Sequence, residues 1–374
     1  MHRRIWLWAT FLLGITLNLP QSIGVQSSSP RPTVTPGSDL ANPPANSSNQ
    51  PQSTASPRPS PAAASPSPNL ATPSHTPTNP RTLGHEKIVQ LKIFLDSHCF
   101  GPGEIDDHWS ELCANALRLY QRASGQNATG QIDPQLEQEL SNLTSVYTTY
   151  QIKPDDFASV GKSPQKPAAQ AKLKHMPYPS VAEFVAERFH TSVSFLAKLN
   201  PGKNLNQLLA GDSVKVPNVA PLEVEALKSA DEIPPKPQLK SHRIEIDTKD
   251  KILTVMDGEK VLAGFPITPG SKQLPAPIGT WQIVKITTMP WFRWDKAMLL
   301  HGRRSGDFHS IPPGPRNEVG LVWIGLNKKG IGIHGTNSPD SIGRSASHGC
   351  IRLANWDAVR VLNAVTQGVS VQIN

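Results

Sequence analysis

Proline determines which parts of this chain can form a folded core. Residues 25–82 consist mainly of Pro, Ser, Ala, Thr and Asn, with repeats such as Ser56-Pro57-Arg58-Pro59. Proline lacks a backbone N–H, and the small polar side chains around it bury little apolar surface. We therefore predict a disordered linker at 25–82. The chain has 374 residues, which leaves room after this linker for two or three small domains.

Residues 1–24 have the pattern of an export signal. A basic start containing Arg3 and Arg4 precedes the apolar run Ile5–Leu19, and small residues follow at 22–24. The apolar run is shorter than the ~20 residues that a membrane-spanning helix needs. We expect a signal peptide, or alternatively an uncleaved N-terminal anchor. Either one predicts an exported protein of the periplasm or cell wall.

The charge of the chain is mildly basic, with a formal net charge of +8. The positive charges form no long runs, and no nucleic-acid-binding motif is present in the sequence. We expect no nucleic acid partner. A mildly basic surface suits an anionic partner such as the cell wall.

Residues 83–160 predict a small helical domain. Apolar side chains recur at helical spacing in two stretches, and Gly125 is placed to end the second. Asp133 and Pro134 have the pattern of the N-cap and first residue of a third helix. The apolar positions are Ile88, Leu91, Leu95, Leu112, Ala116, Leu119, Leu136 and Leu140.

Residues 172–219 predict a second small unit of α+β type. Ser180 and Glu183 form a capping box at the start of a helix. A second short helix and then the strand Ser213–Pro217 follow. The predicted linkers on either side are 161–171 and 220–239.

Residues 240–374 predict a mainly β domain, large enough to bury its own core. Apolar and polar residues alternate with strand period, and Asp257-Gly258 indicates a hairpin. One helix is predicted, capped by Asn355 and ended by Gly368. The aromatic segment 289–294 and the histidines His301 and His309 are interpreted as loop residues. The predicted strands are 244–246, 252–256, 261–267, 281–286, 321–326, 331–334 and 369–373.

The chain has three cysteines, and export permits disulfides. Cys99 and Cys113 lie within one predicted helical domain, so they either form a disulfide or remain two buried thiols. Cys350 is the odd thiol left over, which is the pattern of a reactive group.

Cys350 is the candidate nucleophile. Gly349 before it leaves room for a substrate backbone, and the N–H groups of Gly349 and Cys350 are candidate oxyanion donors. His334, at the tip of a predicted strand, is the candidate base, because a thiol needs a base or a positive field to react. We expect the pair to hold a thiolate with a depressed pKa. Arg352 would share a face with Cys350 in a strand.

Two neighbours in the same segment, Ser347 and His348, are expected to orient the loop or to donate to the oxyanion. An alternative use of the histidines is metal binding. His334, His348 and Cys350 would then be three zinc ligands, with water as the fourth.

The pattern His334-Gly335-Thr336 followed by Ser347-His348-Gly349-Cys350 resembles the L,D-transpeptidase (YkuD) family. The segments 275–280 and 312–315 also resemble family segments. The resemblance implies a mainly β L,D-transpeptidase-type catalytic domain at 240–374, with Cys350 and His334 as the catalytic pair. We expect Gly335, Thr336 and Arg352 to bind substrate.

In this family the cysteine attacks a peptidoglycan stem tetrapeptide between its third and fourth residues. It releases D-alanine and passes the acyl group to an amine. The resemblance implies no metal or organic cofactor, and it implies acylation by carbapenem-type inhibitors. Two alternatives remain open: an L,D-carboxypeptidase, in which water accepts the acyl group, and a non-catalytic wall-binding protein.

The two small units also resemble wall-binding modules. Residues 83–160 resemble the three-helix peptidoglycan-binding module, and 172–219 resemble the LysM module, although the usual opening strand is not evident at 174–178. We expect these units to serve location and not chemistry, with peptidoglycan stem peptides and glycan strands as partners, in a monomer.

Overall fold

The computed structural model describes residues 78–143, 145–344 and 349–374. The predicted signal or anchor, and the predicted linker up to residue 77, lie outside these residues. Across the ranges that are described, no helix is both long enough and apolar enough to span a membrane. The last residues of the predicted linker are ordered: Thr78 pairs with Ile132 and Pro80–Thr82 form a 3-10 turn, η1.

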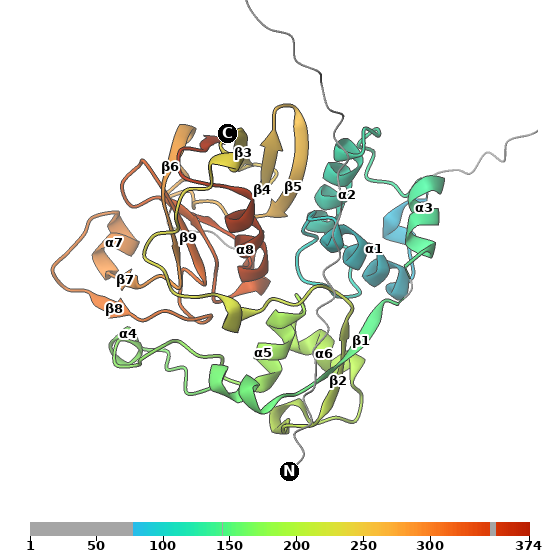
Figure 1. The fold of residues 1–374 in the computed structure, drawn as a ribbon, viewed down its shortest axis with the longest axis horizontal. Coiled ribbons are helices and arrows are strands. Elements are labelled where there is room, and N and C mark those ends of the chain that lie inside the picture. Colours follow the sequence, from blue (N-terminus) through green and yellow to red (C-terminus); the bar gives the residue numbers. More distant parts are fainter. Residues whose placement is uncertain (1–77, 144, 345–348) are drawn as a thin grey trace, which may run out of the picture. The chain divides into compact units, whose positions relative to one another are not determined.

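Three helices form the first unit, at the predicted positions: α1 (His85–Ser97), α2 (Glu111–Ala123) and α3 (Pro134–Ser141) (Figure 1). The Asp133 side chain accepts a hydrogen bond of 2.8 Å from Leu136 N, so it is the N-cap of α3. Gly125 has φ +72°, the left-handed conformation that ends many helices.

The second unit combines the helices α5 (Val181–Arg188) and α6 (Val193–Leu199) with a two-stranded sheet. Strand β2 (Ser213–Pro217) pairs antiparallel with β1 (Tyr147–Gln151). Strand β1 lies within the range 83–160 predicted for the helical domain, and no strand is present at 174–178. The remaining short elements are η2 (Pro154–Ser159), α4 (Pro167–Gln170), η3 (Leu205–Gln207), η4 (Val224–Ala226) and η5 (Pro237–Leu239).

The C-terminal part is built on an eight-stranded sheet, in the order β11-β10-β9-β6-β12-β3-β4-β5. Gly258 has φ +54° and makes the predicted hairpin turn from β4 to β5. The strands are β3 (His242–Asp247), β4 (Ile252–Asp257), β5 (Lys260–Pro266), β6 (Gly279–Thr288), β9 (Val322–Leu326), β10 (Gly332–His334), β11 (Ile351–Arg352) and β12 (Ser370–Ile373).

Three predictions for this part are wrong. The helix that was predicted to end at Gly368 ends at Ala364. The segment interpreted as loop contains the ribbon β7 (Phe292–Trp294) and β8 (His309–Ile311), joined by the helix α7 (Lys296–His301). In addition, Asn355 is not a cap. It is the first residue of α8 (Asn355–Ala364), and Ala354 is the N-cap. A short 3-10 turn, η6 (Pro339–Ser341), precedes this region.

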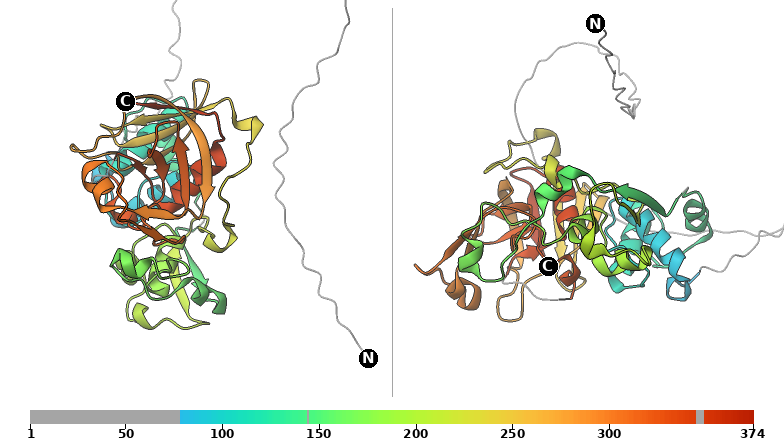
Figure 2. Two further views of the ribbon diagram at one scale, coloured as in Figure 1. Left: turned by 90° about the vertical axis from the view of Figure 1, so that its left-hand side faces the viewer. Right: turned by 90° about the horizontal axis from the view of Figure 1, so that it is seen from below.

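Helix α8 packs against β9 and β10, and helix α2 packs against the edge strand β5 (Figure 2). Beside β5, Gly101 N donates to Gly264 O at 2.8 Å and Gly264 N donates to Cys99 O at 3.0 Å. These bonds cover an edge that would otherwise expose unpaired backbone groups. Buried residues of both small units, such as Ile93 and Phe184, belong to the same core cluster as those of the eight-stranded sheet.

Candidate functional site

The candidate site lies where β10 and β11 run parallel. Ile333 pairs with Ile351, and His334 pairs with Arg352, so His334 and Arg352 lie side by side on one face of the sheet. Cys350 directly precedes β11. The register thus brings residues far apart in the sequence onto two neighbouring strands.

His334 is buried, with 5% of its surface exposed. Its Nδ1 lies 2.6 Å from the carbonyl oxygen of Gly335. A carbonyl can only accept a hydrogen bond, so Nδ1 carries the proton and Nε2 keeps its lone pair. Trp323 of β9 stacks on the imidazole, with ring centroids 5.4 Å apart and planes 20° apart.

The imidazole of His334 is neutral at physiological pH. Burial lowers its pKa to about 4, the bond to Gly335 O opposes this shift, and the positive charge of Arg352 adds to it. The neutral imidazole can therefore accept a second proton, at the lone pair of Nε2.

Cys350 has a protonated thiol in this environment. Burial raises its pKa to about 11, while a hydrogen bond from the Gly332 backbone and the charge of Arg352 lower it in part. The Sγ–H group also donates to Gly330 O at 3.5 Å. The expectation of a depressed thiol pKa is therefore wrong, because burial outweighs the positive field.

Gly349 has φ +104°, a backbone conformation that favours glycine. Ser347 and His348 lie outside the described residues. Arg352 is half-buried on β11. The structure thus brings His334, Gly349, Cys350 and Arg352 into one region.

Thr336 is fully buried, and its Oγ1 accepts a hydrogen bond from Ser338 N at 3.2 Å. Its carbonyl accepts one of 3.0 Å from Asn355 Nδ2. A Cβ on Gly335 would lie 2.1 Å from Asn355 Oδ1, so only glycine fits beside this side chain.

Sequence reasoning missed two residues here, Trp323 and Asn355. Trp323 sits in a predicted strand, but only the strand register shows that it faces His334. Asn355 was interpreted as a helix cap from its local pattern. Its side chain instead accepts from Leu321 N at 3.0 Å and donates to the Thr336 carbonyl.

The other two cysteines form no disulfide with each other. Cys113 is fully buried, and burial raises its pKa to about 12. Cys99 is partly buried, and burial raises its pKa as well. Of the two alternatives, the structure has two separate thiols, and neither is activated by its surroundings.

The zinc alternative needs His348, which lies outside the described residues. Within 78–143, 145–344 and 349–374, no group of three His, Cys, Asp or Glu side chains is arranged to hold a metal ion.

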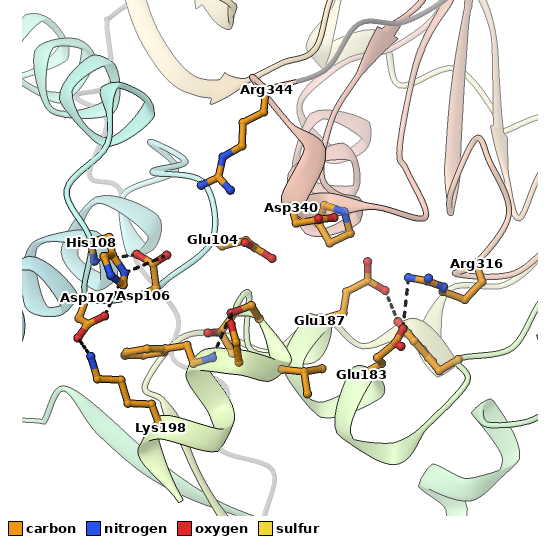
Figure 3. A pocket seen from close by; sticks show the side chains of 17 residues that line it. Glu104, Asp106, Asp107, His108, Glu183, Glu187, Lys198, Arg316, Asp340 and Arg344 are labelled. Atoms are coloured by element: carbon orange, nitrogen blue, oxygen red, sulfur yellow. Dashed lines mark hydrogen bonds and ion pairs between the residues drawn. The ribbon is translucent and has the colours of Figure 1, made fainter. Parts of the chain in front are cut away.

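A separate pocket of about 870 Å³ lies where loops of the C-terminal part meet both small units (Figure 3). Its lining contains both acidic and basic side chains, with Arg316 beside Glu183 at 3.3 Å and Lys198 beside Asp107. His334 and Cys350 are not among the residues that line it. Its ionisable residues are Glu104, Asp106, Asp107, His108, Glu183, Glu187, Lys198, Arg316, Asp340 and Arg344.

Residues 241–373 match the family model of the L,D-transpeptidase catalytic domain, YkuD. A Bacillus licheniformis protein, named as an L,D-transpeptidase (YkuD), is 28% identical over 191 residues, covering 51% of this chain and 92% of that protein. A protein of the same name from Bacillus subtilis is 28% identical over 190 residues, covering 51% of this chain and 91% of its own. Both alignments are longer than the matched catalytic domain, so they extend to residues before 241.

Solved structures overlap with part of the chain. An L,D-transpeptidase from Mycobacterium smegmatis has a TM-score of 0.29 at 19% identity, over 36% of this chain and 58% of that chain. L,D-transpeptidase 3 from Mycobacterium tuberculosis, in complex with a faropenem-derived adduct, has a TM-score of 0.30 at 16% identity. That overlap covers 45% of this chain and 76% of the other. The family model and the curated relatives together support an L,D-transpeptidase catalytic domain at residues 241–373.

Proposed function

We propose that this protein is a peptidoglycan L,D-transpeptidase that uses Cys350 as its nucleophile. The observation that carries the proposal is the state of His334. Its Nδ1–H is held by the Gly335 carbonyl, which leaves Nε2 as a base on the strand next to Cys350. The match of residues 241–373 to the L,D-transpeptidase catalytic domain supports the same reaction.

The acylation half-reaction begins with a protonated thiol on Cys350 and a neutral imidazole on His334. Sγ of Cys350 attacks the carbonyl carbon of stem residue 3, which is bonded to the nitrogen of residue 4. The proton of the thiol passes to Nε2 of His334. The C–N bond then breaks, and the leaving D-alanine amine takes the proton from the imidazolium. The product is a thioester on Cys350.

The second half-reaction transfers the acyl group from Cys350 to an amine. An amine attacks the thioester and gives its proton to His334. The thiolate leaves and takes this proton back. Because burial disfavours both the thiolate and the imidazolium, charge develops only as the bonds change.

The remaining site residues have supporting roles in the proposal. The N–H groups of Gly349 and Cys350 stabilise the oxyanion, and Ser347 and His348 orient that loop. Arg352 binds a carboxylate of the substrate and stabilises developing negative charge. Gly335 and Thr336 shape the segment that holds His334 and contacts the substrate.

The proposed partners are peptidoglycan stem peptides and glycan strands, met outside the cytoplasm. Carbapenem-type inhibitors would acylate Cys350. The faropenem-derived adduct of the M. tuberculosis protein is consistent with such chemistry. The alternatives are an L,D-carboxypeptidase, for which water is the acceptor, and a non-catalytic wall-binding protein.

Mass analysis of muropeptides tests the proposal. Purified full-length protein is incubated with disaccharide tetrapeptides, with Cys350→Ser as the matched control. We expect cross-linked dimers with loss of D-alanine, and none with the control. Tripeptides alone would assign the carboxypeptidase, and unchanged tetrapeptides would favour the non-catalytic alternative.

A further inference from the structure

One residue of the second small unit reaches the segment that carries His334. Glu187, near the end of α5, has 6% of its surface exposed, and it lines the pocket drawn in Figure 3. Its Oε1 accepts a hydrogen bond of 2.9 Å from Asn355 Nδ2. The Tyr178 hydroxyl donates to its Oε2. A carboxylate from one unit is thus buried against a side chain of another.

Asn355 connects this carboxylate to the candidate site. It is fully buried, and Nδ2 has two N–H groups. The two shortest contacts of Nδ2 are to Oε1 of Glu187 at 2.9 Å and to the Thr336 carbonyl at 3.0 Å. With Glu187 in place, the amide has one favoured orientation, in which Oδ1 accepts from Leu321 N.

The Thr336 carbonyl is adjacent in the chain to the carbonyl that fixes His334. Asn355 Oδ1 occupies the space where a Cβ of Gly335 or of Gly320 would lie, at 2.1 Å in each case. The amide therefore packs tightly against the Gly335-Thr336 backbone. The Gly335 carbonyl in turn accepts the Nδ1–H bond that keeps the lone pair of His334 on Nε2.

We propose that Glu187 is a positioning residue of the proposed transpeptidase, which holds Asn355 and thereby the Gly335 carbonyl that fixes the tautomer of His334. The small α+β unit then contributes to the chemistry as well as to location. Burying a carboxylate costs free energy, and its hydrogen bonds to Tyr178 and Asn355 offset that cost. Burial raises the pKa of Glu187 to about 7, while these two hydrogen bonds act in the opposite direction.

The proposal rests on the proposed function only for its kinetic prediction. Glu187→Ala removes the shortest of the three contacts of Asn355 Nδ2 and leaves those to the carbonyls of Thr336 and Pro315, so the amide is held less firmly against the Gly335-Thr336 peptide. We expect kcat to fall about 10- to 100-fold, with KM changed less than about 3-fold, because the base is misplaced and not the binding surface. Glu187→Gln, whose Oε1 can still accept from Asn355, should recover most of the rate, to within about 3-fold.

A readout that needs no activity is the tautomer of His334. In ¹⁵N-histidine-labelled protein, assigned with His334→Gln, wild type should show the Nδ1–H tautomer only. Glu187→Ala should show a mixture that includes Nε2–H. Glu225→Gln is the matched control: Glu225 lies in η4 and accepts a hydrogen bond of 2.7 Å from Arg188 of α5. It should match wild type in both measurements.

The results of these experiments distinguish the proposed function from the positioning role of Glu187. An inactive wild type would contradict the proposed function, while the tautomer would still test Glu187. A folded Glu187→Ala protein with wild-type kcat and a pure Nδ1–H tautomer would overturn the positioning role. If this variant does not fold, Glu187→Asp, which withdraws the carboxylate by one methylene, is measured in its place. It should show the same mixture of tautomers, and a pure Nδ1–H signal would overturn the proposal.

Discussion

At the scale of single residues, the candidate pair is neutral and not an ion pair. Burial raises the pKa of Cys350 to about 11 and lowers that of His334 to about 4. Between these values both groups are uncharged, so the thiolate fraction rises with pH through the whole physiological range. Arg352 is the charged side chain that lowers both pKa values.

We predict that Arg352→Gln slows the reaction of Cys350 with iodoacetamide at pH 8 by about 3- to 10-fold. Loss of the positive charge raises the thiol pKa further, so less thiolate is present at a given pH. The rate is measured by peptide mass spectrometry from pH 6 to 10. Arg243→Gln, on β3, is the control. A plateau of reactivity between pH 5 and 7 in wild type would show a stabilised thiolate, contrary to this account.

The sequence indicated Cys350 and His334 because their motif is local and their residue types are chemically distinctive. It could not indicate the pKa values, since these depend on burial by distant segments. Asn355 was misinterpreted for a related reason. An Asn followed by Asp two residues later is a local capping pattern, but the partners of this side chain, such as Leu321 and Glu187, lie far away in the sequence.

At the scale of secondary-structure elements, prediction succeeded where the pattern was strong. The alternation of apolar and polar residues and the Asp257-Gly258 turn predicted most strands of the sheet. The strand β1 was missed because Tyr147–Gln151 has no apolar alternation, and its partner follows more than sixty residues later. The β7–β8 ribbon was missed because its strands are short and separated by the helix α7.

Helix α8 carries a buried carboxyl group in its first turn. Asp357 has no exposed surface, and burial raises its pKa to about 7. Arg360 lies 3.5 Å away, and Asp96, which is bonded to Arg360 and His190, adds negative charge nearby. Because the pKa in the folded state exceeds the unfolded value, this group stabilises the fold at low pH. That stability is lost as pH rises from about 4 to about 7.

We predict that Asp357→Asn removes this pH dependence. Relative to wild type, the variant should be about 2 to 3 kcal/mol more stable against unfolding at pH 8 than it is at pH 5. Urea unfolding at the two pH values measures this difference. Asp250→Asn, at an exposed position, is the control and should show no such difference. An equal effect of Asp357→Asn at both pH values would mean that Asp357 does not titrate in this range.

At the scale of the whole described molecule, buried side chains of the two small units and of the C-terminal part pack together in common hydrophobic clusters. Met256 and Val261 of the sheet belong to a cluster with residues of α1 and α2. Arg360 of α8 donates to both oxygens of Asp96 of α1, at 2.8 and 2.7 Å. His190 of the second unit contacts the same carboxylate at 3.1 Å. The sequence did not predict these contacts, because linker-like sequence separates the parts.

We predict that residues 78–374 unfold in a single cooperative transition when the full-length protein is unfolded with urea. Far-ultraviolet circular dichroism and tryptophan fluorescence should give the same urea midpoint. Asp96→Asn removes the buried negative charge that Arg360 binds through both of its carboxylate oxygens, and it should cost about 3 to 5 kcal/mol. Lys87→Gln, which breaks the exposed pair with Glu137, is the control and should cost less than about 1 kcal/mol. Two separate transitions in wild type would show that the parts are independent.

The central claim is that Cys350 is acylated by the stem peptide. The most direct measurement is peptide mapping by mass spectrometry after full-length protein is mixed with a stem tetrapeptide and quenched in acid. The account predicts a thioester on Cys350 with the mass of the tripeptide acyl group, and no adduct in Cys350→Ser. An adduct on Cys99 or Cys113, or turnover without any adduct on Cys350, would contradict it.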